Sequence, residues 1–311
     1  MAQFKLYYNS DAGMPTLNGQ SGSLLSVLNF CLVRGSGWVK PFADTLNVGC
    51  FQLPTGSGCG LVVNDSASIT AKEARMSGFD SLTAYNTGSG PFPTAAQGVG
   101  SVAMVVARKS NTADVTARNF VIAADSRSMY MFVLTGDSTS PSTYLAFAFG
   151  DIYSIKTASL DTNACMIIGR SVENSATITN DGLDKLSALT AATAGNFMSR
   201  IAAGSGGSIT ISKHGDGVKG STSTLLGAVP YLNGVDGGIY LSPVWVCEAA
   251  TGNIRGRMRG FYQVLHAIAN FTDLSTYTGA GSYTGKTFVL LKQSGTAGVY
   301  LIETSNTLET N

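Results

Sequence analysis

The segment SMYMFVLTGDSTSPSTYLAFAF, residues 128–149, contains the pattern on which the prediction of the fold rests. Its two apolar runs, MYMFVL and YLAFAF, flank the turn-forming stretch Thr135 to Ser138. Two such runs around a short polar stretch predict a β-hairpin. Aromatic and β-branched side chains would then face each other across the strands, where such pairs stabilise a sheet.

Similar short apolar runs recur along the whole chain. A second hairpin is predicted at Phe288 to Glu303, where apolar residues alternate on both sides of the turn QSGTAG. The runs are bounded by clusters of Gly, Asn, Asp and Ser, as in β-structure. The other predicted strands are Phe4–Tyr8, Val48–Leu53, Gly60–Val63, Glu73–Ser81, Phe120–Ala124, Cys165–Arg170, Ile209–Lys213, Ile239–Cys247 and Arg255–Leu265. The fold class is therefore predicted to be mainly β, with sandwich- or barrel-like sheets.

Two short segments have helical periodicity instead. From Ser23 apolar residues recur at helical spacing, with Ser21 or Ser23 as the expected N-cap and Arg34-Gly35 as the expected end. A second helix is predicted to begin at Asn180 or Asp181. Its apolar residues are Leu183, Leu186, Leu189 and Ala192, with a continuation through Phe197, Met198 and Ile201 past a break near Gly195.

The second predicted helix and the glycine-rich stretch GSGG at 204–207 separate two β-rich parts of the chain. We therefore predict an N-terminal β-rich domain at residues 1–171, a helical and glycine-rich connection at 172–208, and a C-terminal β-rich domain at 209–311. The alternative is a single continuous β domain. No internal repeat of fixed period is present in the sequence, which disfavours a solenoid or a propeller.

Charge is scarce in this sequence. Only 13% of its 311 residues are charged and the net charge is +1, whereas an ordinary soluble domain has about 25% charged residues. Neutral hydroxyl and amide groups cost less to desolvate than ions do, so a neutral polar surface suits a protein that other subunits cover. The balance of charge gives no electrostatic reason to expect a nucleic acid or an anionic membrane as the main partner.

Targeting, membrane and disulfide signals are weak. The first ten residues, MAQFKLYYNS, lack the basic and apolar regions of a signal peptide, so synthesis in a cytoplasm is expected. No run of about twenty apolar residues predicts a membrane span. The five cysteines have irregular spacing and no C-x-x-C pair, which disfavours a disulfide framework and a zinc site. Cys50 and Cys59 flank a loop and could face each other across a hairpin as a disulfide. Reduced thiols in the core are the favoured alternative.

The sequence gives little support for catalysis. His214 and His266 are its only histidines, and no G-x-S-x-G motif accompanies them. The glycine-rich stretch HGDGVKGST at 214–222 lacks the order of a phosphate-binding loop, and no calcium-loop pattern occurs. The candidates for a glycosidase pair are Asp125, Asp137, Asp151, Asp216, Asp236 and Glu248, most of which lie in turn sequences where capping explains them. We predict that the protein is not an enzyme and uses no cofactor or metal.

Two features are candidates for a protein interface. Arg255, Arg257 and Arg259 would project from one face of a strand, as a solvated face, a nucleic-acid contact or a row of intersubunit ion pairs. We favour the interface row, because guanidinium groups suit such contacts. Phe92 lies between two prolines in a predicted loop, 85–94. It would anchor this loop on a neighbouring subunit or, as the favoured alternative, on its own domain.

The two tryptophans bear on carbohydrate binding, which uses exposed aromatic platforms. Trp245 lies within the apolar run 241–246 and is expected in the core, and Trp38 alone would make a small platform. This weakens the prediction of a glycan-binding protein.

Five segments together resemble a family of virion structural proteins of tailed bacteriophages and prophages. They are SDAGMPTLNGQSGSLLSVLNFCLV (10–33), TGSGPFPTAAQ (87–97), HGDGVKGS (214–221), GRMRGFYQ (256–263) and GVYLIETSNT (298–307), and they are spread over nearly the whole chain. The resemblance implies a component of the virion, in the tail, baseplate or neck, with copies of itself and other virion proteins as partners. A contact with the host surface is a further option that it leaves open. It transfers no catalytic residue.

Two alternatives to this function remain. Within the same class, the protein would be a capsid decoration protein. From a different class, it would be a host-surface glycan-binding protein or depolymerase, which requires exposed aromatic residues or a carboxylate pair in a groove.

Overall fold

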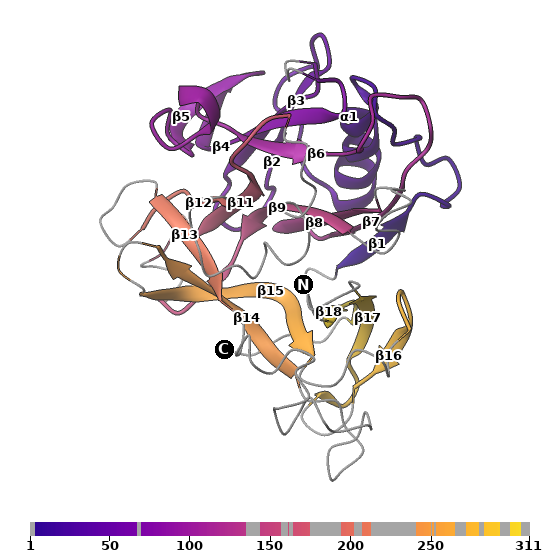
Figure 1. Cartoon of the computed structure of the whole chain (residues 1–311). Helices are drawn as coiled ribbons and strands as arrows, with labels where there is room; N and C mark the ends of the chain where they lie inside the picture. The colour runs from indigo at the N-terminus through magenta and orange to yellow at the C-terminus, as the bar shows by residue number, and fades with distance from the viewer. Residues whose placement is uncertain are drawn as a thin grey trace.

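The protein is mainly β, with curled antiparallel sheets that form a half-barrel (Figure 1). This confirms the predicted fold class. The computed structural model describes residues 4–66, 70–134, 144–156, 161, 164–174, 194–201, 207–212, 241–249, 251, 253–264, 272–279, 283–292 and 299–305. Each predicted strand is present, with small shifts at its ends.

A central group of antiparallel strands is built around the hairpin at 128–149. In order, the paired strands are β1 (Lys5–Tyr8), β7 (Asn119–Ala124), β8 (Ser128–Leu134), β9 (Tyr144–Asp151), β11 (Cys165–Arg170) and β12 (Ala194–Met198). Strands β8 and β9 form the predicted hairpin, in which Met129 lies opposite Phe149.

The N-terminal strands curl over one side of this central group. They are β2 (Val48–Gln52), β3 (Gly60–Asn64), β4 (Glu73–Ala84), β5 (Thr87–Phe92) and β6 (Val105–Arg108). Strand β4 pairs with β3, β5 and β6, and β6 meets β11 where Arg170 lies opposite Val106. The helix α1 (Ser23–Leu28) lies beside them and continues as a π-helical segment, Asn29–Gly35, while a 3-10 turn covers Val99–Ser101.

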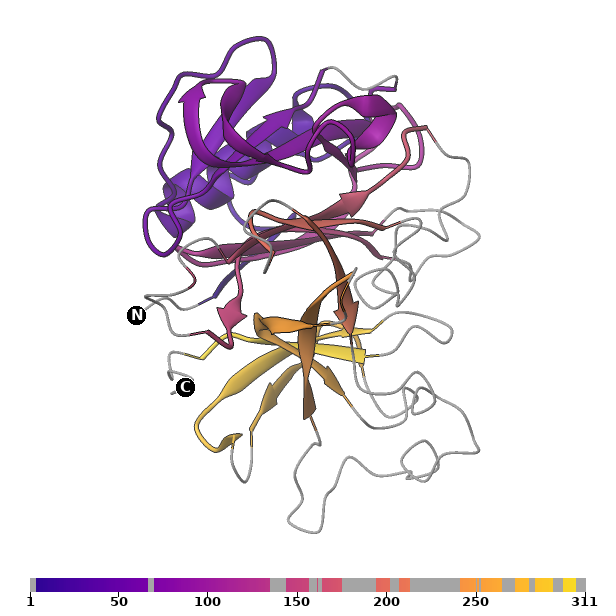
Figure 2. The same cartoon turned by 90° about the vertical axis from the view of Figure 1, so that its left-hand side faces the viewer.

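The C-terminal strands cover the other side. They are β13 (Gly207–Ser212), β14 (Leu241–Glu248), β15 (Ile254–Val264), β16 (Thr276–Thr278), β17 (Thr287–Lys292) and β18 (Val299–Glu303), with the short β10 (Tyr153–Ser154) paired to β15. Strands β17 and β18 form the second predicted hairpin. Figure 2 shows the central strands between the N-terminal part and the C-terminal strands.

The hairpin β8–β9 is buried on both faces, which explains its continuous apolar sequence. On one face Met129, Met131 and Val133 pack in a core with α1 and the N-terminal strands. On the other face Tyr130 and Phe132 pack against residues of β14, β15, β17 and β18. The alternation of side chains along a strand therefore divides this hairpin between two cores.

The N-cap of α1 differs from the prediction. The N-cap residue is Gly22, and neither Ser21 nor Ser23 caps the helix with its side chain. The Ser23 hydroxyl donates to the backbone carbonyl groups of Asn18 and Gln20. A carboxylate oxygen of Asp65 instead accepts the backbone N–H groups of Leu24 (2.8 Å) and Leu25 (3.3 Å). The prediction was wrong because the cap comes from a residue distant in sequence, whose negative charge also suits a helix N-terminus.

Two other local predictions were wrong. Residues 180–193 of the second predicted helix lie outside the described residues, but its continuation is strand β12, in which Phe197 lies opposite Ile167. The unpaired side of β11 supplies partners for an apolar segment with little helix propensity of its own. The predicted loop 85–94 contains strand β5, which pairs with β4. Its residue Gly88 is required there, because a Cβ atom would lie 2.3 Å from the carbonyl oxygen of Ser81.

The predicted division into domains stays a prediction. The structure adds one observation to it. Strand β12, within the predicted connection 172–208, pairs with β11 of the N-terminal part and with β13 of the C-terminal part.

Candidate functional site

The arginine row of β15 lies on the C-terminal strands, and two of its members are buried. Arg255 is 3% exposed and Arg259 is 5% exposed, whereas Arg257 is half-buried. Arg255 contacts Asp161 (Nη2 to Oδ1, 2.7 Å) and lies 3.5 Å from Glu248. Carboxylates of the same chain therefore neutralise Arg255, and the same is true of Arg259.

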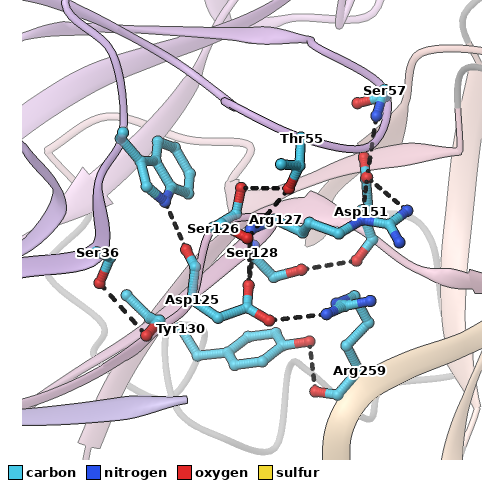
Figure 3. A network of polar contacts seen from close by, with 12 residues as sticks. Ser36, Thr55, Ser57, Asp125, Ser126, Arg127, Ser128, Tyr130, Asp151 and Arg259 are labelled. Atoms are coloured by element: carbon cyan, nitrogen blue, oxygen red, sulfur yellow. Dashed lines mark hydrogen bonds and ion pairs between the residues drawn. The ribbon is translucent and has the colours of Figure 1, made fainter. Parts of the chain in front are cut away.

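Asp125 is the partner of Arg259 and lies in the turn between β7 and β8 (Figure 3). One oxygen of its carboxylate accepts the backbone N–H groups of Arg127 and Ser128, both at 2.7 Å. The other oxygen is 2.7 Å from Nη2 of Arg259. The indole N–H of Trp38 donates to the carbonyl oxygen of Asp125 at 2.6 Å. Charge-assisted bonds of this kind are stronger than neutral ones, so Asp125 firmly joins the central hairpin to β15.

Asp151 extends this network to the loop before β3. Its carboxylate oxygen Oδ2 accepts the backbone N–H of Ser57 (3.1 Å) and Nε of Arg127 (2.9 Å). The hydroxyl of Ser128 donates to the backbone carbonyl of Asp151 at 2.8 Å. Gly56 is needed in this loop because its φ is +81° and a Cβ atom would lie 1.9 Å from the Asp151 carboxylate. The network thus fixes the loop against the turn between β7 and β8.

Tyr130 and Tyr153 complete the surroundings of Arg259. The Tyr130 hydroxyl donates to the backbone carbonyl of Arg259 at 2.9 Å, and burial raises the pKa of this hydroxyl above its usual value. Burial lowers the pKa of Arg259, but the charge and hydrogen bond of Asp125, together with Tyr153 and Tyr130, outweigh that effect, so the pKa is raised overall. The guanidinium group also lies 4.7 Å from the centre of the Tyr153 ring. Arg259 therefore remains charged inside the protein.

The candidate carboxylates have structural contacts. Asp125, Asp151 and Glu248 lie next to Arg259, Arg127 and Arg255 respectively. The expected turn-capping role is confirmed for Asp125. The other three candidates, Asp137, Asp216 and Asp236, lie outside the described residues, as do His214, His266 and the stretch 214–222.

One buried ion pair gave no signal in the sequence. The side chains of Asp65 and Lys109 are both 0% exposed and contact each other, and the Lys109 ammonium also donates to the carbonyl oxygen of Gln20 at 2.6 Å. Burial raises the pKa of Asp65 and lowers the pKa of Lys109, although each charge favours the other. Lysine is usually exposed, and only the fold brings Lys109 to Asp65 at the N-terminus of α1.

Phe92 lies inside its own chain. Its side chain is 0% exposed and stacks on Phe149, with ring centroids 6.1 Å apart and an angle of 14° between the rings. Phe92 therefore packs within its own chain, as the favoured alternative predicts, and its side chain is not available to a neighbouring subunit. Strand β5, which ends at Phe92, is anchored in this way to the central hairpin.

We expect the substitution Phe92→Leu to lower the free energy of unfolding by about 1–2 kcal/mol, because the smaller side chain loses the stacking contact and leaves a void. Urea denaturation followed by tryptophan fluorescence would measure this loss. The substitution should leave the oligomeric state unchanged at temperatures where the protein is folded. Loss of oligomers with unchanged stability would contradict this assignment of Phe92 to the core.

Both tryptophans differ from expectation. Trp38 is 2% exposed and so makes no exposed platform, whereas Trp245, expected in the core, is half-buried. Along β14 the neighbouring residues Val244 and Val246 point to the core, so Trp245 lies on the other face. It is opposite Arg257, which in turn is opposite Tyr153. The guanidinium of Arg257 lies 5.5 Å from the centre of the Tyr153 ring. We call the half-buried residues Trp245, Arg257 and Tyr153 the aromatic–arginine strip.

Four of the five cysteines are buried, and Cys247 is half-buried. All five cysteines are free, and Cys50 and Cys59 are both buried. Burial raises the pKa of the Cys165 thiol, and it raises the pKa of Cys31 to about 12. Within the described residues no group of three or more His, Cys, Asp or Glu side chains could hold a metal ion. In the same part of the chain, no helix is both long enough and apolar enough to span a membrane.

Comparison with known proteins adds no family assignment. No model of a protein family matches the sequence, and a search of curated proteins gives no match either.

Proposed function

We propose that this protein is a structural component of a tailed-bacteriophage virion, in the tail, baseplate or neck. In this proposal it acts through protein–protein contacts with copies of itself and with other virion proteins. The resemblance of five segments spread over the chain supports this class of protein. A capsid decoration protein is the nearest alternative, because it would use the same kind of contact on the capsid surface.

The observation that supports the proposal most strongly is the placement of charge. At least twelve of the 20 basic and 19 acidic side chains are buried. They include Asp125, Asp151 and Arg259, the Asp65–Lys109 pair and Glu73 with Arg170. A sequence that has little charge therefore places much of it inside the fold. These twelve charges are withdrawn from the surface, and a surface with less charge costs less to desolvate when other subunits cover it.

Arg257 is the member of the predicted arginine row that is half-buried. Together with Trp245 and Tyr153 it forms the aromatic–arginine strip, which we propose as a contact with a partner. Its three members are half-buried on adjacent strands β14, β15 and β10. Tryptophan, tyrosine and arginine are the residues most enriched in the energetically important parts of interfaces. The role of Arg255 and Arg259 in an interface stays a prediction, and the ion pairs described above give both residues a second role in the fold.

Native mass spectrometry of the purified protein over a range of concentrations tests the proposal. We expect a discrete oligomer, since a virion component contacts identical copies through a repeated interface. The copy number would separate tail or neck symmetry from a trimer typical of a decoration protein. A protein that stays monomeric at every concentration and cleaves bacterial polysaccharide would overturn the proposal in favour of a depolymerase.

A further inference from the structure

Two exposed leucines have a backbone conformation that leucine rarely adopts. The φ angles are +48° at Leu46 and +58° at Leu274, and the side chains are 84% and 41% exposed. A bulky residue with positive φ is unusual because its Cβ atom crowds the backbone, and such strain is found most often at functional sites. Among the described residues, the other non-glycine positions with positive φ are Asn47, Ser101 and Asn174, all of which are polar.

Leu46 is held at the tip of a tight hairpin. Leu46 and Asn47 form its two-residue turn, closed by hydrogen bonds between the backbone groups of Thr45 and Val48 (2.9 and 2.8 Å). The carbonyl oxygen of Leu46 accepts the hydroxyl of Ser66 at 3.0 Å. Asn or Gly is the usual residue at such a turn position. The fold therefore maintains an apolar side chain in water at a site where a polar residue would be less strained.

Leu274 lies in the wall of an apolar hollow. Its backbone N–H donates to the carbonyl oxygen of Leu290 at 2.9 Å, which fixes its position beside β17. The hollow has a volume of about 140 Å³, and its lining includes Leu274, Phe120, Val121, Leu134, Asn9 and Asn119. Sites for small molecules usually measure about 300–1,000 Å³. This hollow is therefore the right size for an apolar side chain and too small for most ligands.

We propose that Leu46 of one copy inserts into the hollow beside Leu274 of a second copy. This inference rests on the proposed self-assembly and names the contact that makes it. The two surfaces match in polarity, because Thr45, Asn47 and Ser66 surround the tip and the hydrogen-bonded pair Asn9 and Asn119 lies at the hollow. None of the described residues that line the hollow is charged, and neither are Thr45, Asn47 and Ser66 at the tip, so the contact of these residues desolvates no charge of theirs. Because the tip and the hollow are different patches, repetition of the contact builds a ring or a filament.

The substitutions Leu46→Asn and Leu274→Asn test this contact separately. Asn tolerates the left-handed conformation, so each variant should fold with an unchanged or higher melting temperature. Each should weaken self-association on the order of 10- to 100-fold, since one apolar side chain is lost from the contact. Val115→Asn is the matched control, because Val115 is an apolar residue that is 76% exposed and lies outside both patches. Analytical ultracentrifugation would measure the dissociation constants.

Cysteine cross-linking identifies the partner patch directly. Copies with Leu46→Cys are mixed with copies with Leu274→Cys and oxidised with diamide, which takes up the two hydrogens released when a disulfide forms. We expect a covalent dimer from the mixture and much less from either variant alone. The unmodified protein, which has the half-exposed Cys247, gives the background.

The outcomes separate the contact from the proposed function. Oligomers that survive both Asn substitutions, with no cross-link in the mixture, would overturn the Leu46 contact and leave the proposed function standing. An unmodified protein that is monomeric at all concentrations would overturn both the contact and the self-assembly. Weakened association in both Asn variants, unchanged association in Val115→Asn and a cross-link in the mixture would support the contact.

Discussion

Replacement of Arg259 by serine is expected to lower the free energy of unfolding by about 3–5 kcal/mol, because it leaves the carboxylate of Asp125 buried without its partner. Asp125 is 3% exposed, so bulk water does not solvate the carboxylate that loses the guanidinium group. A loss of this size is a large part of the stability of an ordinary domain, about 5–15 kcal/mol. Urea denaturation at pH 7, followed by circular dichroism, would measure it.

Arg257→Ser is the matched control for this prediction. It removes the same side chain from the same strand, but Arg257 is half-buried and its contact with Tyr153 is of the cation–π type. Its effect on stability should be about 1 kcal/mol or less. Equal losses of unfolding free energy in Arg259→Ser and Arg257→Ser would contradict the prediction, because the contact with Asp125 would then add no stability of its own. If the aromatic–arginine strip is an interface, Arg257→Ser should instead weaken assembly.

Replacement of Lys109 by methionine is also expected to lower the free energy of unfolding by about 3–5 kcal/mol at pH 7. Unlike the loss in Arg259→Ser, this loss should depend on pH. Burial already raises the pKa of Asp65 with Lys109 present, and loss of that positive charge raises it further. The folded state then binds a proton that the unfolded chain, with an Asp pKa of about 3.9, releases. Stability of the variant therefore falls as pH rises above about 4, and the deficit should be smaller at pH 4 than at pH 7.

The double substitution Lys109→Met with Asp65→Asn separates charge from packing. The neutral amide still offers an oxygen to the N–H groups of Leu24 and Leu25, so the double variant should recover part of the stability and lose the extra pH dependence. Stability curves from pH 4 to pH 8, compared with those of the unmodified protein, provide the measurement. A deficit for Lys109→Met that stays constant across this range would mean that Asp65 does not titrate in the folded state.

The two pairs have a common consequence for the proposed function. Asp65 with Lys109 fixes α1 against the N-terminal strands, and Asp125 with Arg259 fixes the central hairpin to β15. A buried charge that is paired costs less than one that is alone, so each pair favours one arrangement of the elements it joins. A component that contacts many copies in a particle needs such a fixed shape.

Only part of the candidate site could be predicted from the sequence. The row Arg255, Arg257 and Arg259 was found by its spacing, yet its separate roles depend on Asp161, Glu248 and Asp125, which are distant in sequence. Phe92 was assigned to a loop because of its flanking prolines, whereas β4 supplies the partner that makes β5 a strand. Leu46 gave no signal at all, because a positive φ angle is a property of the folded backbone.

The mainly β fold class, the two hairpins and the first helix could all be predicted from the sequence. These features depend on local periodicity and turn chemistry, which act over a few residues. The tertiary structure alone decided the cap of α1 by Asp65, the strand at 194–198 and the burial of Arg255 and Arg259. Each of these depends on a partner far along the chain, and only folding brings such partners within the few ångströms over which hydrogen bonds and ion pairs act.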